Sequence, residues 1–242
     1  MKRSSIGTVL RGKLRAVGFL RSSFYLLIEL RRTLSDSASL DRRLVDLAYE
    51  RPDPWGDATE IGREYLFRAA QMLEAVRGDS TFRDALDIGC AEGAFAELIA
   101  PRCRALLGVD LSPEAIARAT SRKRWPDSVR FATWDLRHDP IPRPFDLIVV
   151  SGVLEYIHNP LRMAEARAKL VAGLDPGGYL QMGTTRANSE VENSWFGKWL
   201  KRGKWINTFF AEHPALRVMA THSAPTYELT LFRKVTENHD EC

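Results

Sequence analysis

The chain has 242 residues, of which 45% are hydrophobic and 27% charged, and it carries a formal net charge of +4. This composition is typical of a globular protein with enough apolar residues for a full core, and it excludes collagen-like and low-complexity classes. Its three cysteines, Cys90, Cys103 and Cys242, are too few and too scattered for a disulfide framework or a thiolate zinc site. We therefore expect a reducing, cytoplasmic compartment and no metal site.

Residues 1–32 carry most of the positive charge. They contain eight lysine or arginine side chains and one acid, Glu29, so their net charge is +7 and the rest of the chain carries −3. A slightly acidic body lacks the basic face that nucleic-acid binding needs, and we expect no nucleic-acid partner. Apolar residues between positions 6 and 28 recur in steps of three and four, which predicts an amphipathic helix. Arg21 interrupts that run, so it does not predict a membrane span.

Two interpretations of this helical arm stay open. One is a basic helix that lies on an anionic membrane surface and holds the protein peripherally at the inner membrane face. The other is a helix that packs on the domain, over its active site. We place the arm at residues 1–50 and the domain at residues 51–242, because the stretch Arg51-Pro-Asp-Pro-Trp-Gly56 is difficult for any regular element to cross.

From residue 60 onward, helical periodicity alternates with short apolar runs. We expect helices over 60–77, 93–100, 113–122 and 160–173, and strands over 85–88, 105–109, 129–133, 145–150, 179–183, 216–222 and 227–233. Strands separated by helices of this size predict right-handed crossovers and parallel pairing, whereas the last two strands surround a turn. The sequence therefore predicts an α/β fold: a Rossmann-like, mostly parallel seven-stranded sheet with helices on both faces and an antiparallel hairpin at its C-terminal edge.

A glycine turn follows the first predicted strand. Gly89 lets the chain turn sharply, and Gly93 lets a ligand and the next helix approach closely. Asp110 ends the second strand, where a carboxylate can accept hydrogen bonds from ribose hydroxyls. Asp87, two residues before Gly89, would repel the pyrophosphate of a dinucleotide and attract a positive centre. The local charge therefore favours S-adenosylmethionine, which combines a sulfonium with an amino acid end and has no phosphate.

Five short motifs stand in register between residues 85 and 183. They are Asp87-Ile-Gly-Cys-Ala-Glu-Gly93, Asp110, Trp134-Asp-Leu136, the run 145–156 and Leu174-Asp-Pro-Gly-Gly-Tyr-Leu180. Together they resemble the class I S-adenosylmethionine-dependent methyltransferases, with Ala91 in the place of the middle glycine of that family's loop.

Further motifs are similar to one family within that class, the nodulation N-methyltransferases, which methylate deacetylated chitooligosaccharide. The similar positions are Asp53-Pro-Trp55, residues 88–95, Ala100-Pro-Arg-Cys103, Lys123-Arg-Trp125 and residues 145–150. This likeness covers about residues 50–183, and the arm at 1–35 has no counterpart in it.

The resemblance implies roles for particular residues at the cofactor. It implies Asp87 at the methionine ammonium group, Asp110 at the ribose and Asp135 at the adenine amino group. The remaining residues expected to line the cofactor site are Gly89, Cys90, Gly93, Leu111, Trp134 and Ser151.

Three residues after the fourth strand are the candidate catalytic groups: Glu155, Tyr156 and His158. Methyl transfer is an in-line displacement, so catalysis depends on holding the nucleophile about 3 Å from the methyl carbon. An alkylamine is mostly protonated at pH 7, so it also needs a base, for which His158 and Tyr156 are placed. Glu155 binds substrate or caps a helix.

We expect Trp55, Tyr65 and Trp195 to bind the substrate, because aromatic rings stack on sugar faces. The activity implied is transfer of a methyl group from S-adenosylmethionine to the amine of an amino sugar or glycan-type acceptor. One alternative is an O-methyltransferase acting on a sugar hydroxyl or a small natural product. The others are a nicotinamide-dependent reductase, which Asp87 disfavours, and a cofactor-binding scaffold without turnover.

Overall fold

The computed structural model describes residues 45–78, 80–157, 159–186 and 202–235. The chain forms two compact units, Met1–Leu47 and Ala48–Cys242, and the sheet with its helices belongs to the second. Residues 1–44 of the predicted basic arm lie outside the described residues, and so do His158 and Trp195.

The predicted fold is confirmed: seven strands form one sheet in the order β3-β2-β1-β4-β5-β7-β6. The strands are β1 (Phe82–Ile88), β2 (Cys103–Asp110), β3 (Val129–Thr133), β4 (Phe145–Ser151), β5 (Leu174–Thr185), β6 (Leu216–Ser223) and β7 (Tyr227–Lys234). The first five pair in parallel, and β7 runs antiparallel to both β5 and β6. The chain order reverses between β1 and β4, where parallel sheets of this kind form a crevice at the carboxyl ends of their strands.

Three of the five helices whose bounds the structure describes begin at residues whose side chains cap the first turn. The five helices are α3 (Glu60–Arg77), α4 (Ala94–Ile99), α5 (Pro113–Ser121), α6 (Pro160–Ala172) and α9 (Arg202–Ala211), with short 3-10 turns η1 (Ala100–Arg102) and η2 (Leu154–Tyr156). The side chains of Thr59, Ser112 and Asn159 accept hydrogen bonds from the first turns of α3, α5 and α6, which satisfies backbone donors left open there. Within the described part of the chain, no helix is both long and apolar enough to cross a bilayer.

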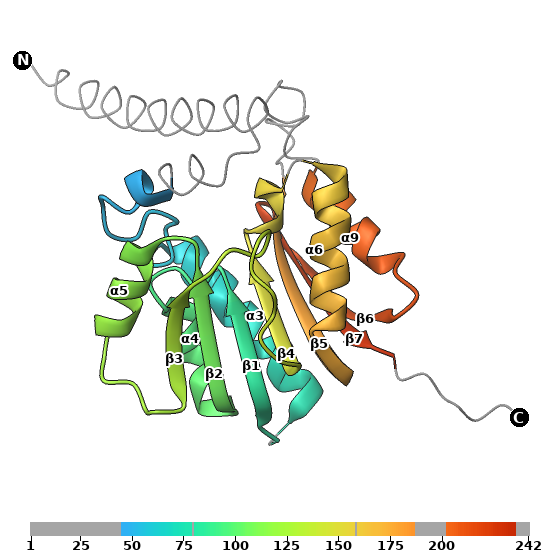
Figure 1. The fold of residues 1–242 in the computed structure, drawn as a ribbon, viewed down its shortest axis with the longest axis horizontal. Helices are drawn as coiled ribbons and strands as arrows, with labels where there is room; N and C mark the ends of the chain where they lie inside the picture. The colour runs from blue at the N-terminus through green and yellow to red at the C-terminus, as the bar shows by residue number, and fades with distance from the viewer. Residues whose placement is uncertain (1–44, 79, 158, 187–201, 236–242) are drawn as a thin grey trace, which may run out of the picture. The chain divides into compact units, whose positions relative to one another are not determined.

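Side chains alternate along the central strands, and this alternation divides the core between the two sheet faces. Ile148 and Val150 of β4 pack with α6 and α9, whereas Leu147 and Val149 pack with α3 and α4. Figure 1 shows α6 and α9 on the near face of the sheet and α3 behind it. Because helices cover both faces, the central strands are apolar on both sides, as a parallel sheet requires.

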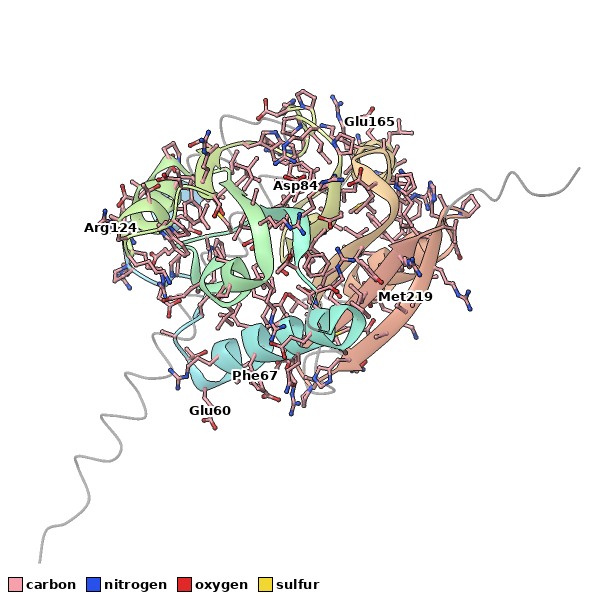
Figure 2. All side chains as sticks on the ribbon, turned by 90° about the horizontal axis from the view of Figure 1, so that it is seen from below. Glu60, Phe67, Asp84, Arg124, Glu165 and Met219 are labelled. Atoms are coloured by element: carbon pink, nitrogen blue, oxygen red, sulfur yellow. The ribbon has the colours of Figure 1, made fainter. Side chains whose placement is uncertain are left out.

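Two elements differ from the sequence-based expectation. Strand β5 begins at Leu174 instead of residue 179, because its pairing with β4 continues through an irregularity between Phe145 and Leu147. Helix α9 was not expected. The outer side of α3 carries Glu60 and Phe67, and Phe67 is 55% exposed (Figure 2).

Candidate functional site

The glycine turn lies at the carboxyl end of β1. Gly89 and Gly93 both have φ of +79°, a conformation that glycine adopts at little cost. A Cβ atom on Gly89 would lie 2.3 Å from Cγ2 of Val153, so no other residue fits there without a shift. Cys90 is buried in this turn, and burial raises the pKa of its thiol, which makes it an unreactive packing residue.

Ala91 stands where the related glycine loops have their middle glycine, and its φ is +48°. A left-handed conformation costs an alanine about 1–2 kcal/mol. Its N–H donates to Oδ2 of Asp110 at 3.1 Å, and the N–H of Ser112 donates to Oδ1 at 2.9 Å. The buried Asp110 carboxylate therefore holds the strained turn against the end of β2, and Leu111 lies half-buried next to it.

Tyr49 is a buried neighbour of Asp110 that the sequence did not single out. It is 1% exposed, and its hydroxyl accepts a hydrogen bond from Nε1 of Trp55 at 2.8 Å. Burial raises the pKa of Tyr49, and the negative charge of Asp110 raises it further. The phenol therefore stays protonated at neutral pH.

Asp87 is the most unusual charge in the site. It is 2% exposed, and among the described residues its Oδ2 has no hydrogen-bond partner. Burial raises its pKa to about 7, with smaller contributions from the charges of Asp110 and Asp57. Because a buried carboxylate is costly without a compensating partner, this position favours a cationic or hydrogen-bond-donating ligand group and disfavours a phosphate.

Asp135 is held by the neighbouring Arg137. The guanidinium places Nε 3.0 Å from Oδ1 and Nη2 2.9 Å from Oδ2, and the backbone N–H of Arg137 also donates to Oδ1 at 3.0 Å. Burial alone would raise the pKa of Asp135, but these hydrogen bonds outweigh it and lower the pKa. The indole of the preceding Trp134 donates to the carbonyl of Pro140 at 3.2 Å, so both residues are fixed in place after β3.

Tyr65 of α3 reaches the end of β4, where its hydroxyl lies close to the side chain of Ser151. It lies directly over Gly183 of β5: a Cβ atom there would be 1.7 Å from Oη of Tyr65 and 3.0 Å from Oγ of Ser151. Burial raises the pKa of Tyr65, so its hydroxyl is a donor and not a base at neutral pH. Gly183, which the sequence did not single out, is what makes room for this contact.

Two aromatic residues from distant parts of the chain meet near this point. The rings of Trp55 and Tyr156 have centroids 6.3 Å apart, and Trp55 is 37% exposed. Oε1 of Glu155 accepts a hydrogen bond from the N–H of Thr185 at 2.7 Å, which joins η2 to the end of β5. Candidate substrate and catalytic residues are thus brought together here.

Arg118 of α5 fixes the segment that carries Tyr49 and Trp55. Its Nη1 lies 2.9 Å from Oε1 of Glu92 in the glycine turn and 3.0 Å from the carbonyl oxygen of Arg51, and Nη2 donates to the carbonyl of Tyr49. The same Glu92 oxygen accepts from the N–H of Asp53 at 3.2 Å. One guanidinium therefore joins α5, the glycine turn and residues 49–53.

The described residues contain no group of three or more histidine, cysteine or acidic side chains placed to hold a metal ion.

Comparison with known proteins finds nodulation protein S among the relatives of this chain. The family model described as nodulation protein S (NodS) matches residues 34–200. Nodulation protein S of Bradyrhizobium diazoefficiens is 37% identical over 143 residues, which are 59% of this chain and 66% of that protein. Nodulation protein S of Rhizobium tropici is 38% identical over 135 residues, 55% of this chain and 56% of that protein. The chain thus matches somewhat less than two thirds of the length of these relatives.

A solved structure agrees with this result. The crystal structure of N-methyltransferase NodS from Bradyrhizobium japonicum WM9 in complex with S-adenosyl-L-homocysteine superposes with a TM-score of 0.65. It is 29% identical, and the alignment covers 80% of this chain and 97% of that chain.

Proposed function

The chain belongs to the nodulation protein S family, and from this premise we propose that it is an S-adenosylmethionine-dependent N-methyltransferase. The acceptor we propose is the amine of an amino sugar or glycan-type compound, and the second product is S-adenosylhomocysteine. Support comes from the similar N-methyltransferase NodS, whose structure contains S-adenosylhomocysteine.

The observation that carries the proposal is the buried carboxylate of Asp87. One of its oxygens has no hydrogen-bond partner among the described residues. The residue is 2% exposed and lies near the carboxyl end of β1. The amino acid end of S-adenosylmethionine offers an ammonium group that would compensate this charge. When bound, the cofactor supplies a methyl group on a positively charged sulfur, which the acceptor displaces without any need for acid catalysis.

The residues of the chain then bind the cofactor, orient the acceptor and exclude water from the site. In this proposal Asp110 accepts hydrogen bonds from the ribose hydroxyls, and Asp135 accepts one from the adenine amino group. The Trp55 and Tyr156 rings, 6.3 Å apart, offer apolar faces on which a sugar ring can stack. Tyr65, whose hydroxyl stays protonated next to Ser151, is a further donor at the end of β4.

The acceptor amine must lose a proton before or during transfer. His158 is the residue we propose as its base. It lies outside the described residues, two positions after the end of η2, which carries Glu155 and Tyr156. Most of the rate acceleration comes from holding amine and methyl carbon in line, because orientation alone can supply about 7–11 kcal/mol.

Transfer of labelled methyl from S-adenosylmethionine to a deacetylated chitooligosaccharide, beside its fully N-acetylated twin, tests the proposal. We expect label on the free amine only. Label on both would identify a hydroxyl acceptor and hence an O-methyltransferase. No label together with no calorimetric binding of S-adenosylhomocysteine would refute the methyltransferase assignment itself.

We also propose that the protein is cytoplasmic and that residues 1–32 contact an anionic membrane surface peripherally. Their net charge of +7 and helical periodicity support this. The full chain should sediment with anionic liposomes, and a variant with Arg11, Lys13, Arg15 and Arg21 replaced by glutamine should not. Equal sedimentation of both would leave packing on the domain as the role of the arm.

A further inference from the structure

A buried polar cluster lies under α9 at the carboxyl end of β5. Asn207 of α9 is 8% exposed, and Thr184 of β5 is 3% exposed. The amide nitrogen Nδ2 of Asn207 donates to Oγ1 of Thr184 at 2.9 Å and to Oε1 of Glu228 at 2.6 Å. Thr184 and Glu228 are cross-strand partners in β5 and β7. One amide group therefore ties α9 to both strands at this end of the sheet.

Two further contacts fix the cluster in place. The hydroxyl of Ser223, at the end of β6, lies 3.1 Å from Oε2 of Glu228, so both carboxylate oxygens have partners. Gly203 lets α9 and β5 approach backbone to backbone, because a Cβ atom there would lie 2.3 Å from the carbonyl oxygen of Thr185. The end of β5 therefore cannot move independently of α9.

The end of β5 in turn holds the segment that carries the candidate acceptor residues. The N–H of Thr185, which follows Thr184, donates to Oε1 of Glu155 at 2.7 Å. The N–H of Gly152, just before η2, donates to the carbonyl of Gly183 at 2.9 Å. Hydrogen bonds therefore connect α9 to β5, and β5 to both ends of the stretch from Gly152 to Glu155.

The cluster is not arranged for stability alone. The amide oxygen Oδ1 of Asn207 is buried and has no hydrogen-bond partner among the described residues, and an unsatisfied buried acceptor lowers the free energy of unfolding. Apolar side chains at these positions would avoid that cost, so the polar contacts favour a role in positioning. Asn207 and Glu228 also lie beyond residues 34–200, which the family model matches, so the family resemblance assigns them no role.

We propose that Asn207 is a positioning residue for the acceptor: through the end of β5 it sets the place of Glu155 and Tyr156 in η2. This inference rests on the proposed function. The proposed cofactor residues lie on β1 and β2 and after β3, on the other side of β4 in the sheet order. Loss of the Asn207 contacts therefore weakens acceptor binding and leaves cofactor binding as it is.

The first variant to test is Asn207→Asp in the full chain. It removes both amide donors and places a second carboxylate against Glu228. Calorimetry should show that the complex with S-adenosylhomocysteine binds a deacetylated chitooligosaccharide about tenfold or more weakly. The KM for this acceptor should rise by the same factor, and the affinity for S-adenosylhomocysteine itself should not change.

Two further variants separate positioning from general damage. In the double variant Asn207→Asp with Glu228→Gln, the amide and the carboxylate exchange places. One donor–acceptor pair forms again, so most of the acceptor affinity should return. Thr184→Val keeps the shape of the side chain and removes only the contact between Asn207 and β5. It should weaken acceptor binding in the same direction, and it decides the question if Asn207→Asp does not fold.

Leu216→Ala is the control for lost stability. Leu216 is buried in the core at the opposite end of β6, where it pairs with Lys234. The variant should lower the melting temperature through a cavity and leave both affinities unchanged.

Unchanged acceptor affinity in Asn207→Asp and Thr184→Val would overturn the inference. So would equal weakening of S-adenosylhomocysteine, no recovery in the double variant, or the same loss of acceptor affinity in Leu216→Ala. Failure of the unchanged protein to bind S-adenosylhomocysteine or the acceptor would instead refute the proposed function.

Discussion

Replacing Arg118 with alanine tests whether residues 49–53 are held against the glycine turn by one side chain. The substitution removes the only described donor that joins Glu92 to the carbonyl groups of Tyr49 and Arg51. The Glu92 side chain is 17% exposed, so water compensates its lost partner only in part. The segment from Tyr49 to Asp53 would then keep a single hydrogen bond to the glycine turn, from Asp53 to Glu92.

The size of the effect follows from these contacts. A net hydrogen bond contributes about 0.5–1.5 kcal/mol, and one to a charged group about 1.5–3 kcal/mol. The Arg118 side chain is 27% exposed, and solvent screening reduces the ion-pair contribution. We expect a loss of about 2–3 kcal/mol in the free energy of unfolding. Because Glu92 belongs to the glycine turn and loses its partner, the affinity for S-adenosylhomocysteine should fall about tenfold or more.

Chemical denaturation and calorimetry measure both quantities, and Arg102→Ala is the control. Arg102 also pairs with a glutamate, Glu74, but these side chains are 39% and 44% exposed. Such a pair contributes at most about 1 kcal/mol, and it does not contact residues 49–57. Equal losses in the two variants, or an unchanged affinity in Arg118→Ala, would refute the reasoning.

Three further substitutions give sharp expectations. Asp110→Asn should keep a folded protein but lower the affinity for S-adenosylhomocysteine about tenfold or more, since a carboxylate acceptor is lost; calorimetry with unchanged affinity would count against the ribose assignment. Gly89→Ala should lower the melting temperature more than Gly78→Ala. Both glycines have positive φ, but only at Gly89 would the new Cβ atom meet a neighbouring side chain, that of Val153. Equal shifts in melting temperature would contradict this. Gly183→Ala should cost about 1–3 kcal/mol of stability by overpacking, and adding Tyr65→Phe should restore part of it; no recovery in denaturation experiments would show that the hydroxyl is not the obstacle.

Much of the fold could be predicted because the signals are local. Helix α3 has the predicted bounds, Glu60–Arg77, since Thr59 supplies the cap, apolar residues recur in helical steps and Gly78 ends the helix. Strand β5 was predicted short because Pro176 and two glycines resemble a turn, whereas pairing with β4 extends the strand past them. The start of β5 is thus set by its pairing with β4, and the sequence of residues 174–185 alone does not reveal this pairing.

The residues of the candidate site also divide into those with a local sequence signal and those placed by long-range contacts. The positions of Asp87 and Asp110 could be predicted from the sequence because each lies at the end of a strand, and the carboxyl ends of parallel strands meet at one edge of a sheet. Tyr49 and Arg118 could not, because their roles arise from contacts between distant parts of the chain. Arg118 contacts Tyr49 across 69 residues and Glu92 across 26, and no spacing rule links such positions.

The placement of β7 between β5 and β6 has a consequence for how the chain is made. While it is synthesised, β5 has β4 as its only partner until residues 227–234 follow, and its buried Leu180 and Met182 lie on an open edge. An apolar strand with unpaired backbone groups is a template for pairing with other chains. Completion of the sheet therefore waits for residues 227–234, and until they pair, the open edge of β5 favours contact with other chains.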